Sequence, residues 1–333
     1  MDRIRLNQIA IVLPVYNDWA AAQQLIPLIE DALARTDYRA RVLLVDDASA
    51  IASPEEWPED LHHIEEVSIL HLRRNLGHQR AIAIGLVHLY QNWTDLDAVI
   101  VMDADGEDRP QDIPALLERF AVEGGRKVIF AARSKRLESA GFQFFYHAYR
   151  LLHKALTGVS VRVGNFSVLP KEALERLMVI SELWNHYAAA IFRARIPFTS
   201  IPLPRGRRLA GRSKMNFASL VVHGLSAISV FSDVVGARLL ALTAFAGLAV
   251  SLLIGLTAGI RLFTDLAIPG WATYVSGILL IILAQALIVS VALAFLIMNG
   301  RASQSFIPMR DAPLFAGRVE IVVPAFARET VYE

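Results

Sequence analysis

The sequence has no cysteine among its 333 residues. Disulfides, thiolate metal sites and a cysteine nucleophile are therefore excluded, and the absence fits a reducing compartment. No glycine-rich turn follows the first apolar run, residues 9–15, and no Walker pattern is present, so the usual dinucleotide and P-loop signatures are missing. The net charge is only +1, with no dominant basic stripe in residues 1–214, which gives no argument for a nucleic-acid partner.

Charge is almost absent from residues 239–298, although it is frequent before and after them. Residues 239–260 and 271–298 are each long enough to cross a hydrocarbon core of roughly 30 Å as a helix. Together with a hydrophobic content of 54%, they predict a soluble part joined to two transmembrane helices. Basic residues lie on the outer sides of the two runs, which predicts that both termini face the cytoplasm. These residues are Arg205, Arg207, Arg208, Arg212, Lys214, Arg238, Arg301, Arg310 and Arg318.

Apolar residues recur at helical spacing just before the first span, over residues 216–237. This pattern predicts an amphipathic helix that lies on the bilayer surface, and a helix packed on the soluble domain is the alternative. The expected organisation is then a cytoplasmic catalytic domain (1–215), an interfacial helix (216–237), a two-helix transmembrane domain (238–299) and a cytoplasmic tail (300–333).

The soluble part alternates short β-rich runs with amphipathic helical patterns, an order that predicts an α/β domain with a parallel, Rossmann-like sheet. Ligands of such sheets gather at the carboxyl ends of the strands. The expected strands are 9–15, 41–46, 67–72, 98–103 and 127–132, and the expected helices are 19–34, 78–91 and 113–122.

Acidic residues follow two of the expected strands. Asp103 and Asp105 are separated only by Ala104, so their carboxylates can bind one hard divalent ion, and Glu107 could supply a further oxygen. The alternative is a solvated acidic turn that caps the helix beginning near Pro110.

Two sets of short motifs occur in order along the chain. The first set is Pro14-Val15-Tyr16-Asn17, Val45-Asp46-Asp47-Ala48-Ser49, Arg74-Asn75-Leu76-Gly77 and Asp103-Ala104-Asp105; the second is Arg133 and Arg136, Gly164-Asn165-Phe166 and Gly211-Arg212-Ser213-Lys214. The first set resembles the motifs of inverting family 2 glycosyltransferases, which have a GT-A fold. The second set resembles, more narrowly, those of the polyprenyl-phosphate glycosyltransferases related to dolichol-phosphate mannose synthase.

The resemblance implies a role for each matching residue. Asp103 and Asp105 would hold Mg²⁺ or Mn²⁺ against the donor diphosphate, and Glu107 is a further metal candidate from its position beside them. The basic residues of the downstream motifs would serve the lipid phosphate and the leaving group, namely Arg133, Arg136, Arg212 and Lys214. The nucleotide-sugar site would comprise Pro14, Tyr16, Asn17, Asp46, Asp47, Asn75, Gly77, Asp103, Ala104 and Asp105.

The sequence departs from the family pattern at three places. Asp18 stands where the family usually has Glu, Gly106-Glu107 where it usually has Leu-Gln, and Arg109 where it often has Pro. Glu107 matters most, because an additional negative charge beside a metal changes the local electrostatics.

The expected activity is metal-dependent transfer of one sugar, with inversion, from a UDP- or GDP-sugar to undecaprenyl or dolichyl phosphate at the cytoplasmic face of the inner membrane. A phosphate monoester is already an anion at neutral pH, so such an acceptor needs positioning more than a strong general base. Transfer to a lipid hydroxyl and a non-catalytic nucleotide-sugar-binding membrane protein are the alternatives. Small residues such as Gly247, Gly255 and Gly259 allow close helix packing, so a homo-oligomer is a further expectation.

Overall fold

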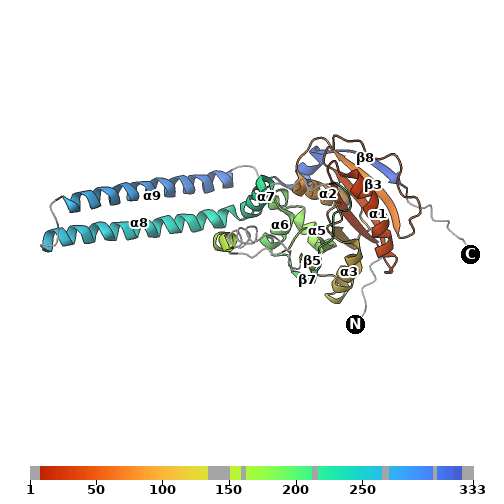
Figure 1. Cartoon of the computed structure of the whole chain (residues 1–333), viewed down its shortest axis with the longest axis horizontal. Helices are drawn as coiled ribbons and strands as arrows, with labels where there is room; N and C mark the ends of the chain where they lie inside the picture. The colour runs from red at the N-terminus through yellow and green to blue at the C-terminus, as the bar shows by residue number, and fades with distance from the viewer. Residues whose placement is uncertain are drawn as a thin grey trace, which may run out of the picture. The chain divides into compact units, whose positions relative to one another are not determined.

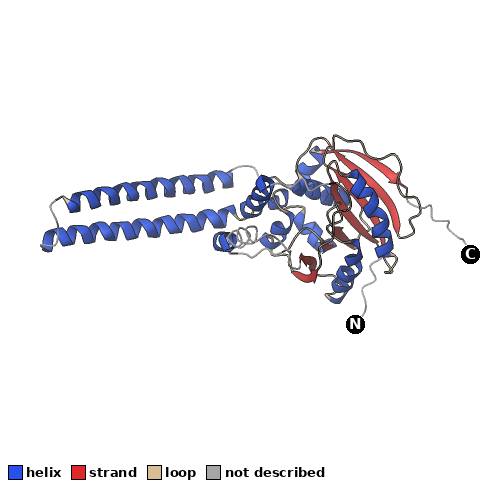
Figure 2. Cartoon of the chain, viewed as in Figure 1, coloured by secondary structure: helices blue, strands red, loops and turns tan. Residues whose placement is uncertain are grey.

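The computed structural model describes residues 8–133, 151–158, 163–211, 217–264, 270–302 and 306–324. The chain divides into two compact units. The sheet unit is drawn from residues 1–140, 161–230 and 306–333, and the helical unit from residues 141–160 and 231–305. Figure 1 shows the course of the chain, and Figure 2 shows the division into helices and strands.

The sheet unit is built on an eight-stranded sheet with the order β7-β5-β6-β4-β1-β2-β3-β8. β4, β1, β2 and β3 run parallel to one another, while β6 and β8 run antiparallel to their neighbours. The strands are β1 (Gln8–Val15), β2 (Arg39–Asp46), β3 (Ile64–Leu72), β4 (Ala98–Val101), β5 (Val128–Arg133), β6 (Ser167–Pro170), β7 (Phe198–Leu203) and β8 (Ala316–Val323).

Helices cover both faces of this sheet (Figure 2). Side chains alternate along β1, so Ile9, Ile11 and Leu13 pack with α1 and α3, whereas Ala10 and Val12 pack with α2, α5 and α6. The helices are α1 (Trp19–Leu33), α2 (His78–Asn92), α3 (Ile113–Val122), α5 (Lys171–Leu177), α6 (Tyr187–Arg193), α7 (Phe217–Ser229) and α10 (Pro308–Asp311), with 3₁₀ turns η1 (Pro110–Asp112), η2 (Ser181–Trp184) and η3 (Ala312–Leu314).

The five strands and three helices predicted from the soluble part are all present. The sheet itself is mixed rather than wholly parallel, because β6 inserts antiparallel between β5 and β4 and β8 adds antiparallel to β3. β6 is only four residues long, and β8 is mostly exposed, so neither gives the long buried apolar run that identifies a central parallel strand.

Two expected boundaries differ from the structure. Residues 300–333 were expected to form a tail, yet residues 306–323 contain α10, η3 and β8 and belong to the sheet unit. The amphipathic pattern of residues 216–237 is also divided: α7 ends at Ser229, and the long helix α8 begins at Ser232.

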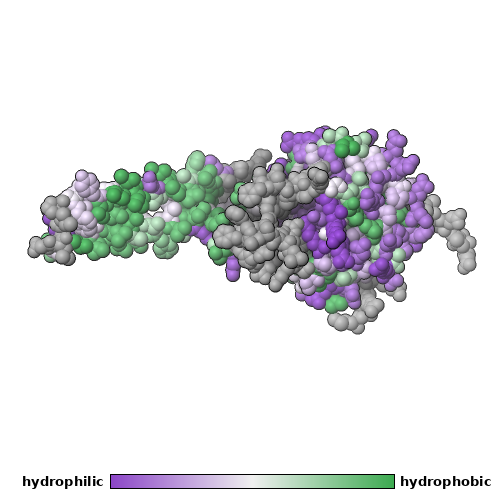
Figure 3. All heavy atoms as spheres, viewed as in Figure 1, coloured by the Kyte–Doolittle hydropathy of each residue, from purple (hydrophilic) through white to green (hydrophobic). Residues whose placement is uncertain are grey.

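The helical unit contains two long apolar helices, α8 (Ser232–Phe263) and α9 (Trp271–Ala302). A helix of 32 residues is about 48 Å long, more than a hydrocarbon core of roughly 30 Å requires. The most apolar stretch of each is not buried by protein, and its surface is hydrophobic in Figure 3. The two helices pack on each other, with a hydrogen bond of 2.7 Å between the hydroxyls of Ser290 and Thr243.

Candidate active site

The carboxyl end of β4 carries Asp103, whose polar contacts come from three parts of the chain. Its backbone N–H donates to Asp108 Oδ2 at 2.9 Å. Its Oδ1 lies 3.1 Å from Nε2 of His78, at the start of α2, and accepts a longer hydrogen bond of 3.5 Å from Asn165 Nδ2. Asn165 also lies 3.0 Å from the His78 ring, so Asp103 is held within a polar cluster rather than in a free turn.

The pKa of His78 is raised by this cluster. Burial lowers it, but the negative charge of Asp103, its hydrogen bond to the ring, and the further carboxylates of Asp108 and Asp105 outweigh that effect. The imidazole therefore holds its proton more strongly than an ordinary histidine does.

Asp105 and Glu107 face residues 204–211, which follow β7 and are called the basic segment below. Arg208 pairs with Asp105 at 2.9 Å and also with Asp18, while Arg205 pairs with Glu107. All of these side chains are about one-fifth exposed, which makes the pairs partly shielded from solvent.

Backbone hydrogen bonds also join the basic segment to residues 103–108, which are called the acidic loop. Gly206 N–H donates to the Glu107 carbonyl at 2.8 Å, and Leu209 N–H donates to the Asp105 carbonyl at 2.9 Å. A Cβ at Gly206 would lie 2.3 Å from the carbonyl oxygen of Gly106, so only glycine permits this approach. The two loops therefore form one docked structure.

The acidic loop contains carboxylates that could bind a divalent ion, but two of them, Asp105 and Glu107, pair with arginine side chains of the protein. Among the described residues, no three His, Asp or Glu side chains converge on one point, and Glu107 is directed to Arg205. Asp103 and Asp105 nevertheless lie two residues apart at a strand end and present hard oxygen ligands, which suit Mg²⁺ or Mn²⁺. These two residues fit a metal ion, provided that Asp105 exchanges Arg208 for it.

Asp46 is the last residue of β2 and Asp47 follows it, and both are almost fully buried. Asp47 accepts backbone hydrogen bonds from Leu76 and Gly77 at 2.7 and 2.8 Å, so its carboxylate fixes the turn that leads into α2. Burial nevertheless raises the pKa of Asp47 above its ordinary value, because the two hydrogen bonds only partly offset desolvation. Asp46 accepts a hydrogen bond from Ser49 N–H at 2.9 Å and contacts the ring of His71 at 2.9 Å.

The other expected donor-site residues lie around the same edge of the sheet. Pro14 pairs with Val45 within β1 and β2, and Tyr16 beyond it keeps 44% of its surface exposed. Asn75 donates to the Asp47 carbonyl at 3.1 Å, and Gly77 has a φ of 93°, which favours glycine. Ala104 is buried between the two carboxylates. The strand ends are thus brought together.

The expected lipid-phosphate residues are mostly beyond what the structure describes. Arg133 is the last residue of β5, where its backbone pairs with Leu203 of β7, but its side chain lies outside the description. Arg136, Arg212 and Lys214 lie outside the described residues.

The family model described as "Glycosyl transferase family 2" matches residues 10–178, which is half of the chain and includes the carboxyl ends of β1, β2 and β4. The chain belongs to glycosyl transferase family 2. The membership predicted from the motifs is confirmed, and so is the fold class: a Rossmann-like α/β domain of the GT-A type with two long apolar helices.

Two curated relatives of this glycosyltransferase are informative. The chain is 28% identical over 290 residues to the uncharacterised glycosyltransferase YkcC of Bacillus subtilis (strain 168), covering 83% of this chain and 86% of the relative. It is 28% identical over 229 residues to the undecaprenyl-phosphate 4-deoxy-4-formamido-L-arabinose transferase of Salmonella choleraesuis (strain SC-B67). This second alignment covers 66% of each chain.

Solved structures resemble the glycosyltransferase more distantly. Glucosyl-3-phosphoglycerate synthase from Mycobacterium tuberculosis, in complex with Mn²⁺, UDP and glucosyl-3-phosphoglycerate, has a TM-score of 0.47 and 16% identity, covering 69% of this chain and 80% of that one. Mannosyl-3-phosphoglycerate synthase from Rubrobacter xylanophilus has the same score and identity, with coverages of 80% and 78%.

Several residues around the candidate site were not predicted from the sequence. Arg205 and Arg208 were expected mainly to set membrane topology, whereas the structure directs them to Glu107 and Asp105. His78 follows directly after Arg74-Asn75-Leu76-Gly77, at the start of a helix near a strand end, and that position was a usable signal. His71 lies inside a strand and carries no such signal.

Proposed function

We propose that the chain transfers a single sugar from a nucleotide sugar to a polyprenyl phosphate. The observation that carries the proposal is the docking of the basic segment on the Asp103–Asp105 loop, since it brings guanidinium groups to the place where a donor diphosphate and an anionic acceptor would meet. The relative named as an undecaprenyl-phosphate sugar transferase supports the same acceptor class.

Asp103 and Asp105 would hold Mg²⁺ or Mn²⁺ in this reaction. The ion would neutralise the departing diphosphate. His78 and Asn165 fix the Asp103 carboxylate, and Arg208 keeps Asp105 paired until a metal is bound. Released from Asp105, the Arg208 guanidinium is free to bind phosphate oxygens, for which its planar fork is well suited.

The transfer follows from the charges of the two substrates. An oxygen of the acceptor phosphate attacks the anomeric carbon, the bond from that carbon to the donor diphosphate breaks, and the nucleoside diphosphate leaves with the bonding electrons. The attacking oxygen carries no proton at neutral pH, so no base must remove one. Arginines at the site offset repulsion between the two anions and orient them. We assign this role to Arg205 and Arg208, with Arg133, Arg136, Arg212 and Lys214 as further candidates.

The acceptor requires a membrane location, and we propose that α8 and α9 span the plasma (inner) membrane with the sheet unit and both termini in the cytoplasm. Their length and apolar composition support this proposal. On α7, which precedes α8, Val222 and Leu225 keep 62% and 58% of their surface exposed, which suits a helix in contact with lipid headgroups. A homo-oligomer stays a prediction.

The test is an assay of the full-length protein in nanodiscs with undecaprenyl phosphate, Mn²⁺ and a panel of labelled UDP- and GDP-sugars. We expect one donor to give a lipid product whose sugar is released by mild acid, because a glycosyl phosphate is labile where an ordinary glycoside is stable. An acid-stable product would instead show transfer to a lipid hydroxyl. Calorimetric binding of a nucleotide without any product would show a non-catalytic binding protein.

A further inference from the structure

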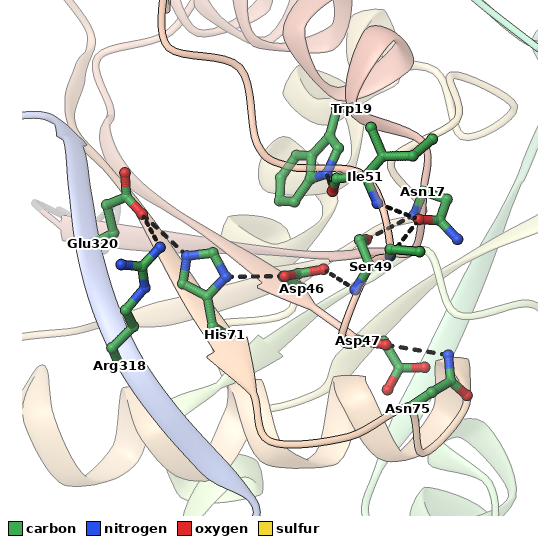
Figure 4. Close-up of polar contacts among 11 residues, drawn as sticks. Asn17, Trp19, Asp46, Asp47, Ser49, Ile51, His71, Asn75, Arg318 and Glu320 are labelled. Atoms are coloured by element: carbon green, nitrogen blue, oxygen red, sulfur yellow. Dashed lines mark hydrogen bonds and ion pairs between the residues drawn. The ribbon is translucent and has the colours of Figure 1, made fainter.

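β8 joins the catalytic sheet although both long apolar helices precede it in the chain. It lies at the edge, antiparallel to β3, with Leu70 opposite Val319 and Ile69 opposite Glu320. The proposed transfer does not explain why residues that follow the membrane helices return to this edge. Figure 4 shows the polar side chains that link β8 to the strand ends.

His71 of β3 connects β8 with the end of β2. Its Nε2 lies 3.1 Å from Glu320 Oε2, and its Nδ1 lies 2.9 Å from Asp46 Oδ2 (Figure 4). Arg318 contacts the same Glu320 oxygen at 3.2 Å. The His71 ring thus links Glu320 of β8 to the buried carboxylate of Asp46.

The hydrogen-bonded chain continues from Asp46 to the loop after β1. Asp46 Oδ1 accepts from Ser49 N–H at 2.9 Å, and Ser49 Oγ accepts from Asn17 N–H at 2.8 Å. Asn17 Oδ1 in turn accepts from the backbone N–H groups of Ala50 and Ile51 at 2.7 and 3.1 Å (Figure 4). Glu320 is therefore connected, through His71, to both loops that carry the expected nucleotide-binding residues.

These loops adopt backbone conformations that need support. Asn17 has a φ of 51°, in the left-handed region that asparagine tolerates, and Ala48 has a φ of 55°, which costs alanine about 1–2 kcal/mol. Tyr16 precedes Asn17, and Asp47 precedes Ala48. Asn17 is itself a member of the hydrogen-bonded chain, and Ala48 is followed by Ser49, which is another member.

The order of the strands indicates which part of the donor this chain affects. β2 lies two strands from β4, with β1 between them, so the ends of β2 and β4 are separated by roughly 10 Å. If the donor diphosphate lies at Asp103 and Asp105 on β4, the nucleoside extends across β1 toward β2. β8 pairs with β3 on the side away from β2, so it lies nearer to the end of β2 than to the end of β4.

We propose that His71 and Glu320 are positioning residues for the nucleoside of the sugar donor, so that the segment after the membrane helices is part of the donor site. Through Asp46, Ser49 and Asn17, they hold the loops after β1 and β2 in the conformation that receives the base and ribose. This inference rests on the proposed function, because it assumes a nucleotide-sugar donor.

The test measures UDP and GDP binding to the full-length protein in nanodiscs with Mn²⁺, by calorimetry, together with donor KM, acceptor KM and kcat. His71→Ala removes the bridge and should weaken binding of the preferred nucleotide roughly fivefold to tenfold, the effect of about one hydrogen bond. Donor KM should rise by a similar factor, whereas acceptor KM and kcat at saturating donor should stay within about twofold of wild type.

Conservative variants separate positioning from general stability. His71→Asn retains an N–H near the position of Nδ1 but cannot reach Glu320, so its nucleotide affinity should lie between those of wild type and His71→Ala. Glu320→Ala loses the same contact and should weaken binding to a similar intermediate degree. Arg73→Ala is the matched control, because Arg73 donates to the Ala316 carbonyl at 2.9 Å and so anchors β8 without joining the chain to Asp46. Its nucleotide affinity should equal that of wild type.

The outcomes distinguish the two proposals. Wild-type protein that binds neither UDP nor GDP would refute the proposed function, and this inference with it. Wild-type binding that His71→Ala and Glu320→Ala leave unchanged would overturn the inference alone. An equal loss in Arg73→Ala would also overturn it, because the effect would then come from the attachment of β8 and not from the polar chain.

Discussion

Replacement of Arg208 by alanine tests whether the protein's own guanidinium and a divalent ion compete for Asp105. Arg208 lies 2.9 Å from Asp105, and both side chains are 19% exposed. Exposed pairs contribute about 0.2–1 kcal/mol and breaking a fully buried one costs about 3–5 kcal/mol, so we expect about 1–2 kcal/mol for this contact. If metal binding must break it, Arg208→Ala should bind Mn²⁺ roughly fivefold to thirtyfold more tightly.

The same variant should turn over more slowly, because it lacks the group that we assign to the phosphates. Mn²⁺ affinity is measured by electron paramagnetic resonance or calorimetry on the nanodisc-bound protein, separately from activity. Arg207→Ala is the control, since it removes the same charge from an exposed neighbour and should leave Mn²⁺ affinity unchanged. Unchanged or weaker Mn²⁺ binding in Arg208→Ala would refute the competition.

Three further changes probe the framework of the site. Asp47→Ala removes both hydrogen bonds to the turn before α2 and should destabilise the sheet unit by about 2–4 kcal/mol, measured by denaturant unfolding. Gly85→Ala places a methyl group 2.7 Å from Val45 Cγ2 and should lower stability by about 1–2 kcal/mol, although alanine favours helix; a gain in Tm would contradict the close packing. Burial raises the pKa of Glu30, but hydrogen bonds from His62, His63 and Ile64 outweigh burial and lower the pKa below 4.5. The ionised Glu30 carboxylate therefore stabilises the fold above pH 4.5, and this contribution is lost as the pH falls through the folded-state pKa. Glu30→Gln should therefore flatten the decline in stability between about pH 5 and pH 3, and equal acid profiles of the two proteins would exclude this contribution.

The sequence predicted the parallel half of the sheet because that half obeys local rules. Runs such as residues 9–15 and 98–103 are apolar and rich in β-branched residues, and their polar ends identify the edge where ligands bind. β8 could not be predicted in the same way: its partner β3 lies nearly 250 residues earlier, as the separation of His71 from Glu320 shows, and its residues are mostly exposed. Long-range pairing of an exposed edge strand leaves almost no local pattern.

The sequence predicts candidate residues for the site, which stay a prediction, but it does not predict how their side chains pair. Asp103 and Asp105 were identified from their spacing after a strand, whereas the partners Arg208 and His78 depend on which loops dock together. Asp46 and Asp47 were expected to face the donor, yet both carboxylates are nearly buried and bind backbone N–H groups. A sequence shows that a strand ends in two acids, but not how their oxygens are shared between protein and ligand.

Product analysis tests the central claim most directly. Nanodisc-bound wild-type protein is incubated with Mn²⁺, undecaprenyl phosphate and each nucleotide sugar, beside Asp105→Asn, and the lipid fraction is analysed by mass spectrometry before and after mild acid. The account predicts one new lipid heavier by a single sugar, formed by wild type, nearly absent with Asp105→Asn, and cleaved by the acid. No such lipid with any donor, or equal amounts from both proteins, would contradict it.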